Sequence, residues 1–424
     1  MSKTLQKILG SLAGLALGVA VVLAAGYFSD ERAVGAAKVV PVAEFSGPLR
    51  LVWLQFSSDA VEITGVAQAD FLAALRPDTE VLLTLAGQQE RAVFEQFLSN
   101  HKLTKLLHNR VRIVEVTGPV TPWTRDRALY LDGGAGGLRL WVPPAPDQAW
   151  QRRFNDWQAV PTLGSAIKGA KVLELPLEFD GGDLTLLSDA VVFGSNLVAK
   201  NRSRGFATAQ DLARSLQVWT GRAALALGTH DGDVPRYHLA MYWAPTGRRT
   251  AIVGDPQLAR AITGPRFALG DLSVETGELL VADDSTPTQA QFDRAAADLV
   301  RAGWAVERVP VVAFDERTYV TWTNAVAETD ADHKIVYLPT YASASDGSDA
   351  PIRQLDALGA AAWQRAGFAV RPIRVAGVWR HHGTIGCLVA VLQRAAGPDG
   401  PNSPSTSPAA TDLGCRSRRK ELND

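Results

Sequence analysis

Short apolar runs rich in β-branched and aromatic residues recur along this chain, and helical stretches separate some of them. The helical stretches carry apolar residues three and four positions apart, and they lie at 87–103, 207–221, 286–303 and 352–367. The pattern predicts an α/β fold with many strands and few helices, without the strict strand–helix alternation of a doubly wound sheet or a TIM barrel. The predicted strands lie at 49–56, 80–86, 110–116, 127–133, 171–177, 189–195, 250–256, 278–283, 304–311, 334–341 and 368–375.

The N-terminal segment combines a basic start with a long uncharged run. Lys3 and Lys7 precede an apolar stretch at 8–28 that is about long enough to span a bilayer. Small residues around Ala24 also offer a cleavage site, so residues 1–30 are predicted to be a signal anchor or a cleaved signal peptide. Lysines on the N-terminal side favour export of the remaining chain. We therefore expect a protein that is membrane-anchored with an extracytoplasmic domain, or secreted.

The other end of the chain has a different composition. Residues 396–424 are rich in Pro, Ser, Gly and charge, which predicts a disordered tail. No linker interrupts residues 45–395, which are expected to form a single domain.

Composition excludes several classes of function. The net charge of −1 and the lack of a basic stripe argue against a nucleic-acid partner. Cys387 and Cys415 form neither a disulfide framework nor a zinc-binding spacing, and no Walker loop, GxGxxG or HExxH motif is present.

Two acidic motifs stand next to predicted strands. "TPWTRDRALYL" places Trp123, Arg125 and Asp126 ahead of a strand, where an Arg–Asp pair could be a structural ion pair. "LEFDGGDLTLL" places Asp180 and Asp183 around two glycines. It is interpreted as a tight turn in which Gly supplies positive φ, and which can bring a carboxylate close to a ligand.

Three further residues have both a structural and a functional interpretation. His238 starts an apolar and aromatic run, where a histidine is more often a hydrogen-bonded structural residue. Asn324 lies within a hydrophobic segment, and a buried amide is either costly or useful. Cys387 follows a bend containing Gly383 and Gly386, and is either a small core residue or a nucleophile.

The order and spacing of these motifs resemble the guanidine-modifying (pentein) superfamily. The chain looks most like the branch of agmatine deiminases and bacterial, Porphyromonas-type peptidyl-arginine deiminases. The resemblance runs from about 49 to 392, and the stretch 317–387, "TYVTWTNAV…KIVYLPTYASASDGSDA…GFAVRPIRV…GTIGC", is its most specific part.

The resemblance implies a five-fold pseudo-symmetric α/β propeller with its active site in a central channel. It also implies residue roles: Cys387 as nucleophile, His238 as general acid/base, Asp126 as guanidinium ligand, Trp123 as channel wall, Asn324 as a residue that shapes the pocket, and Asp180 as the acidic residue near the reacting group.

The implied chemistry suits these residue types. A carboxylate forked onto two N–H groups holds a guanidinium, and a cysteine thiolate can then attack its central carbon. Histidine protonates the leaving ammonia and activates water to release a ureido product. The expected activity is that of a hydrolase acting on C–N bonds of linear amidines, with a peptidyl-arginine or agmatine-like substrate. No metal or organic cofactor is expected, and the only expected macromolecular contact is with the membrane, through an uncleaved N-terminal segment.

Two positions depart from the family pattern. The family's His-x-Asp motif reads His238-Leu239-Ala240 here, so the second guanidinium carboxylate is missing, although dimethylarginine hydrolases also lack it. Asp231 or Asp233 could substitute. The residue before the nucleophile, often His or Asn, is Gly386. Because of these two departures, the alternative interpretation is a catalytically silent pentein that binds a cationic guanidino ligand. Amidino transfer is also open, whereas a papain-like hydrolase has no supporting sequence around Cys387.

Overall fold

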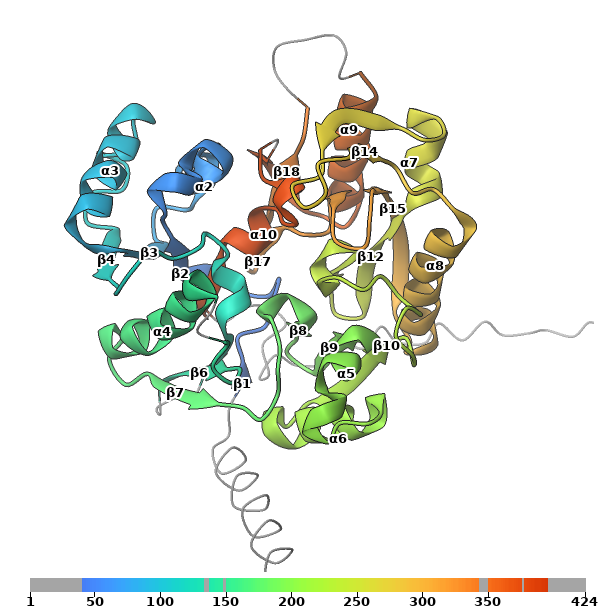
Figure 1. Cartoon of the computed structure of the whole chain (residues 1–424), viewed down its shortest axis with the longest axis horizontal. Coiled ribbons are helices and arrows are strands. Elements are labelled where there is room, and N and C mark those ends of the chain that lie inside the picture. The colour runs from blue at the N-terminus through green and yellow to red at the C-terminus, as the bar shows by residue number, and fades with distance from the viewer. Residues whose placement is uncertain (1–39, 133–136, 148–149, 343–349, 376, 396–424) are drawn as a thin grey trace, which may run out of the picture.

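A computed structural model describes residues 40–132, 137–147, 150–342, 350–375 and 377–395. The predicted segments 1–30 and 396–424 lie outside these residues. Within the described part, no helix has the length and apolar character needed to cross a bilayer. The prediction of an α/β fold is confirmed: helices lie at the periphery and the short helix α10 (Ile385–Leu388) lies near the middle (Figure 1).

Five of the sheets in the described residues follow one plan. A first strand pairs antiparallel with a second, the second pairs parallel with a third, and helices connect the two parallel strands. The five sets are β20 (Ala390–Arg394), β2 (Leu49–Gln55), α2 (Val61–Ala74) and β3 (Glu80–Leu85); β5 (Leu129–Asp132), β6 (Leu138–Val142), α4 (Gln151–Ala166) and β7 (Lys171–Glu174); β8 (Leu184–Leu186), β9 (Ala190–Gly194), α5 (Ser195–Asn201), α6 (Ala209–Thr220) and β10 (Ala223–Leu227); β11 (Trp243–Gly247), β12 (Thr250–Asp255), α7 (Pro256–Thr263), α8 (Thr286–Arg301) and β15 (Ala305–Ala313); and β17 (Val326–Thr329), β18 (Lys334–Thr340), α9 (Ala350–Arg365) and β19 (Ala369–Arg374).

The remaining elements extend these sheets or stand beside them. Strand β4 (Val111–Glu115) follows helix α3 (Gly87–Asn100) and pairs with β3. Strands β1 (Val40–Pro41) and β16 (Tyr319–Thr321) pair antiparallel with β5 and β15. A separate hairpin of β13 (Ala268–Leu272) and β14 (Leu279–Val281) lies in the chain between α7 and α8.

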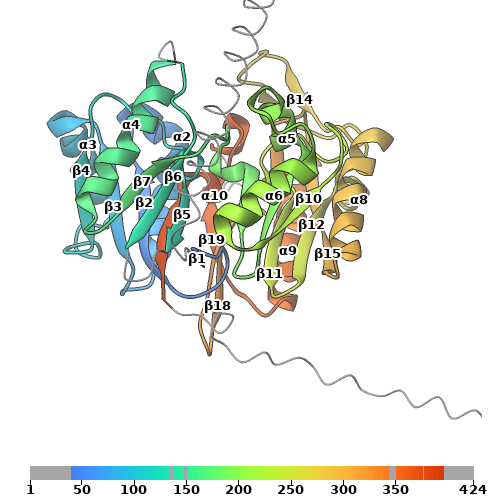
Figure 2. The same cartoon turned by 90° about the horizontal axis from the view of Figure 1, so that it is seen from below.

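The last strand completes the first sheet. Strand β20 pairs with β2, with Trp53 opposite Ala390, and both residues are buried. Leu392 is also buried, and full burial of such a side chain contributes about 1.5–3 kcal/mol. Seen from below, β2, β3 and β5–β7 form one half of the molecule, β10–β12 and β15 the other, and β18 and β19 lie between them (Figure 2). This closure positions α10, which immediately precedes β20.

The expected strands all correspond to strands of the structure, and the four expected helices correspond to α3, α6, α8 and α9. Helix α8 begins at Thr286 behind the capping residue Ser285, and Gly303 and Gly367 follow α8 and α9 with positive φ.

The described residues contain more strands than helices, as predicted, but helices α2, α4, α5, α7 and α10 had no counterpart among the expected helices. Helix α2 buries polar Thr64 and Gln68 together with apolar side chains, which blurs an amphipathic period. Helix α4 contains Pro161 and buries Asn155 and Asp156, so it lacks a clear apolar stripe.

Candidate active site

The five motifs occupy equivalent places in the five sheets, since each stands just ahead of a first strand. The 3-10 helices η2 (Thr124–Arg127), η4 (Gly181–Asp183) and η6 (Leu239–Met241) precede β5, β8 and β11. Asn324 precedes β17, and α10 precedes β20. Segments far apart in sequence therefore meet, and the side chains of Cys387, His238, Asp126, Asp180 and Asn324 form one buried cluster.

Cys387 lies on α10 with 2% of its surface exposed. The amide nitrogen of Asn324 lies 3.0 Å from its Sγ and 2.9 Å from the sulfur of Met241. The glycines before Cys387 are required by close packing. A Cβ at Gly386 would lie 2.0 Å from Asn324 Oδ1, and one at Gly383 would lie 2.5 Å from the Trp123 ring. Both glycines therefore let the cysteine segment approach its partners, as the sequence predicted.

His238 is buried between two carboxylates. Its Nδ1 lies 3.7 Å from Asp126 Oδ1 and its Nε2 lies 3.7 Å from Asp180 Oδ2. Burial alone would lower the pKa of His238, but Tyr237, Asp126, and the interactions with Asp180 and Cys387 raise it well above its usual value. The raised pKa favours the protonated imidazole, which places a positive charge beside the thiol.

Asp126 is not paired with Arg125. The guanidinium of Arg125 instead contacts both carboxylate oxygens of Glu44, at 2.6 and 2.8 Å. Asp126 is 6% exposed, and its Oδ1 has no hydrogen-bond partner within the described protein. A buried carboxylate oxygen without a donor is costly, so Asp126 is prepared to accept hydrogen bonds from a ligand.

Asp180 is held by cations that sequence reasoning missed. Its Oδ1 accepts a 2.6 Å hydrogen bond from Arg153 and its Oδ2 lies 3.4 Å from Lys200 Nζ. Lys200 also bonds the buried Asp183 at 2.7 Å. Burial alone would raise the pKa of Asp180, but the polar contact with His238 and the charges of Lys200 and Arg153 hold it well below its usual value. Neither cation lies in a motif that would have identified it.

The glycines between Asp180 and Asp183 were predicted to supply positive φ in a tight turn, and the structure differs. Gly181 and Gly182 belong to η4, and neither has positive φ. A Cβ at Gly181 would lie 2.0 Å from the Arg125 carbonyl oxygen, and one at Gly182 would lie 2.5 Å from Cγ of His238. Gly181 is therefore needed for close approach of the acidic segment to the Arg125 backbone, and Gly182 for its approach to His238, rather than for a left-handed turn.

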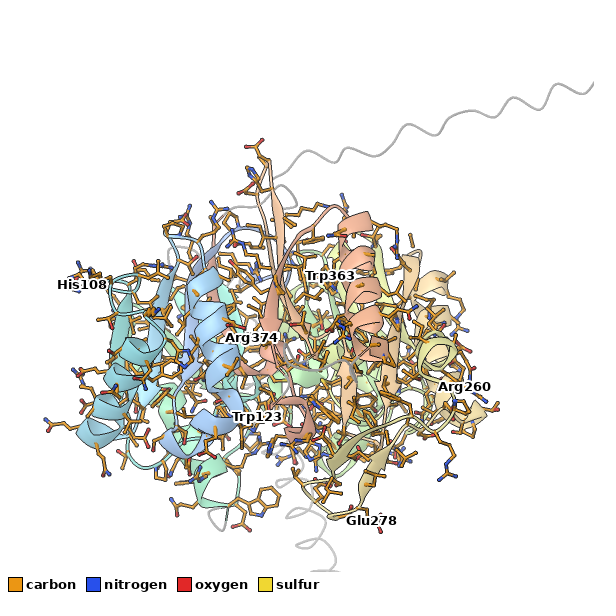
Figure 3. The ribbon with its side chains drawn as sticks, turned by 90° about the horizontal axis from the view of Figure 1, so that it is seen from above. His108, Trp123, Arg260, Glu278, Trp363 and Arg374 are labelled. Atoms are coloured by element: carbon orange, nitrogen blue, oxygen red, sulfur yellow. The ribbon has the colours of Figure 1, made fainter. Side chains whose placement is uncertain are left out.

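A cavity of about 280 Å³ opens onto the acidic pair Asp126 and Asp180. Arg153, Lys200 and Trp157 also line it. Trp123 is not among the lining residues of this cavity. It is half-buried against Gly383, beside the cysteine segment, on the lower face of Figure 3.

Asp231 and Asp233, the two acids expected to replace the carboxylate absent at Ala240, have partners close to them in sequence. Asp233 accepts the backbone N–H groups of Thr229 and His230, and Asp231 is exposed and lies 3.5 Å from Arg236. Asp233 also lies 4.0 Å from Arg294 of helix α8. Both carboxylates therefore have structural partners, and completion of the clamp by one of them stays a prediction.

One group in the described residues has the spacing to hold a metal ion: Asp330, Asp332 and His333. These residues follow β17 and are largely exposed, and none of them belongs to the cluster around Cys387. The cluster itself consists of groups suited to nucleophilic and acid–base chemistry on a cationic ligand.

Comparisons with known proteins identify solved structures that share this fold. No family model matches the chain, and no curated protein matches it by sequence. Among solved structures, a cysteine-to-serine variant of C. jejuni agmatine deiminase with substrate bound aligns with a TM-score of 0.57 at 13% identity, over 85% of this chain and 97% of that one. Agmatine deiminase of Enterococcus faecalis gives 0.57 at 12% identity, over 84% and 96%. A provisionally assigned peptidyl-arginine deiminase gives 0.55 at 14%, over 84% and 99%. The chain thus shares its fold with the agmatine deiminase and peptidyl-arginine deiminase structures.

Proposed function

We propose that this protein is a guanidine hydrolase, a deiminase that converts a guanidino group to a ureido group and ammonia. The observation that carries the proposal is the convergence of Cys387, His238, Asp126 and Asp180 in one buried cluster. A fold shared with deiminases would be uninformative if these groups were scattered, because function depends on the site and not on the fold.

The reaction follows from the charges of the cluster. Asp126 Oδ1 accepts N–H groups of the substrate guanidinium and holds its central carbon near Cys387. The Cys387 thiolate attacks that carbon and forms a C–S bond. His238 gives its proton to the departing nitrogen, which leaves as ammonia when the C–N bond breaks.

The second half of the reaction releases the product. Neutral His238 takes a proton from water, and the hydroxide attacks the carbon of the Cys387 thiouronium. Collapse of the adduct breaks the C–S bond and restores the thiolate. The hydroxyl proton passes to ammonia or solvent, which leaves a ureido oxygen derived from water. Asp180, held ionised by Arg153 and Lys200, stabilises the protonated imidazole in both halves.

The finer parts of the proposal concern substrate, location and symmetry. The substrate is a peptidyl-arginine or agmatine-like compound, in line with the names of the similar structures. The basic and apolar start of the sequence supports export, as an anchored or secreted protein. The shared plan of five sheets supports a five-fold arrangement around a central channel.

The alternative is a silent relative that binds a guanidino ligand without turnover. It is favoured by the buried Ala240, which leaves Asp126 without the usual second carboxylate. A ureido-specific colour assay decides between them. Purified full-length protein is incubated with arginine peptides, free arginine, agmatine and methylarginines, with Cys387→Ser as the matched control. Ureido product and ammonia from the wild type alone support the enzyme. Ligand binding without product from either protein supports the silent relative.

A further inference from the structure

The hairpin β13–β14 is tied by ionic contacts to the segments that surround the site. Asp271 lies 2.9 Å from Arg380, just before the cysteine helix. Glu275, in the turn of the hairpin, lies 2.6 Å from Arg317 and 3.2 Å from His382 Nε2.

The contacts of His382 fix the plane of its ring. Its Nδ1 lies 3.1 Å from the hydroxyl of Thr318, while its Nε2 faces Glu275. Burial and the charge of Arg317 lower the pKa of His382. Nε2 of His382 thus faces the Glu275 carboxylate, and Nδ1 faces the Thr318 hydroxyl, which itself donates to Asp315 at 2.9 Å.

Tyr237 links this arrangement to the candidate acid/base. Its ring meets His382 edge-on, with centroids 6.3 Å apart and planes at 71°. The guanidinium of Arg317 stands over the same ring at 5.3 Å. The Tyr237 ring also stacks on His238, with ring centroids 4.1 Å apart and ring planes at 12°.

His238 needs such support because its polar partners do not orient it. Both separations between ring nitrogens and carboxylates are 3.7 Å, longer than a normal hydrogen bond. The charges of Asp126 and Asp180 attract the imidazolium but leave its plane free. The stacked ring of Tyr237 and the backbone of Gly182 are in contact with the imidazole and restrict that plane.

We propose that Tyr237 is a positioning residue for His238, and that the β13–β14 hairpin holds Tyr237 in place through Glu275, Arg317 and His382. The inference rests on the proposed function, in which His238 transfers protons. A misplaced general acid/base slows the chemical step while ground-state binding by Asp126 persists.

The kinetic test compares Tyr237→Ala, Tyr237→Phe and Glu275→Gln, with Arg236→Gln as control. Arg236 precedes Tyr237 but makes exposed pairs with Glu316 and Asp231. Tyr237→Ala should lower kcat about 10–100-fold with KM changed less than about threefold, because misplacement by about 1 Å can cost that much. Tyr237→Phe keeps the aromatic ring, so its kcat and its KM should both stay within about threefold of the wild-type values. Equal losses in Tyr237→Phe and Tyr237→Ala, or a loss confined to KM, would overturn the proposal.

The hairpin link is tested in the same assay. Glu275→Gln should lower kcat about 3–10-fold on its own and add little to Tyr237→Ala, because coupled residues are not additive. Full additivity of the two changes would refute the link, whereas Arg236→Gln should match the wild type. Glu275 is half-exposed, so its replacement tests the proposal even if Tyr237→Ala fails to fold.

An NMR measurement separates this inference from the proposed function. The His238 ring signal is assigned by its loss in His238→Gln. Stacking on Tyr237 predicts that the ring current displaces the His238 ring signal upfield. This displacement should disappear in Tyr237→Ala, remain in Tyr237→Phe and decrease in Glu275→Gln. If the wild type turns over no guanidino compound, the proposed function fails, and these shifts still decide the positioning role. An unchanged signal in both Tyr237→Ala and Glu275→Gln would exclude it.

Discussion

The side-chain nitrogen of Asn324 lies 3.0 Å from Sγ of Cys387, and both residues are buried. The contact exists because Gly386 has no side chain: a Cβ there would lie 2.0 Å from Asn324 Oδ1. The hydroxyl of Thr384 donates to the Asn324 carbonyl at 2.5 Å, which joins the same two segments a second time. The glycine that departs from the family pattern is therefore a packing requirement of this site.

Gly386→Ala should lower the free energy of unfolding by about 1–3 kcal/mol, the usual cost of overpacking a filled core. Urea unfolding of both proteins measures the difference. Asn324→Ala in the Gly386→Ala background should recover much of the stability, because the clash is with the Asn324 side chain. Stability that is unchanged in Gly386→Ala would contradict the packing described here.

Asp126→Asn should weaken binding of a guanidino ligand about 10–100-fold, since hydrogen bonds to charged groups contribute about 1.5–3 kcal/mol. Calorimetry on the Cys387→Ser background measures binding without turnover. Asp233→Asn is the matched control, because that carboxylate serves its own loop. Equal affinity in Asp126→Asn and wild type would mean that the guanidinium binds elsewhere.

His238→Ala should slow turnover about 10²–10⁴-fold while the protein stays folded, the usual range for a general acid/base. His230→Ala, an exposed histidine of the preceding loop, should have no such effect. Steady-state kinetics with circular dichroism distinguish the two roles of His238. Loss of the folded state in place of slower turnover would identify a structural histidine.

Cys387 should be alkylated selectively by a haloacetamidine, a reagent that joins a guanidinium-like head to a leaving group. His238 supplies a positive charge beside the thiol and Asp126 positions the cation, so labelling should fall when either is replaced. Mass spectrometry of digested peptides reports each cysteine, and Cys415 serves as an internal control. Equal labelling of both cysteines in all variants would leave Cys387 without a catalytic role.

The stability of the site should depend on pH in two directions. The pKa of His238 is raised, so its stabilising contribution is complete below about 6.5 and is lost as pH rises through the raised value. The pKa of Asp180 is lowered, so its contribution is present above about 3.8 and is lost as pH falls through the lowered value. The stability difference between wild type and His238→Gln, measured by urea unfolding, should therefore shrink from pH 6 to pH 10. If the stability difference between wild type and His238→Gln stayed constant from pH 6 to pH 10, the charges of His238 and Asp180 would not interact.

The sequence by itself determined the class of the fold and the residue types of the site. Apolar runs located the strands, because strand patterns are local properties. The resemblance of the spaced motifs to the guanidine-modifying superfamily singled out Cys387, His238, Asp126, Asp180 and Asn324. Helices α2 and α4 were missed because both bury polar residues, and local periodicity reports only amphipathic faces.

Only the tertiary structure decided which side chains meet. The pairing of Arg125 with Glu44, the attachment of Arg153 and Lys200 to Asp180, and the stacking of Tyr237 on His238 all depend on backbone paths. The glycines illustrate the difference most clearly. Gly182 and Gly386 are visible in the sequence, but the atoms that exclude a Cβ there belong to His238 and Asn324, which lie in other strand connections. Such contacts are set by packing between distant segments, and no local pattern encodes them.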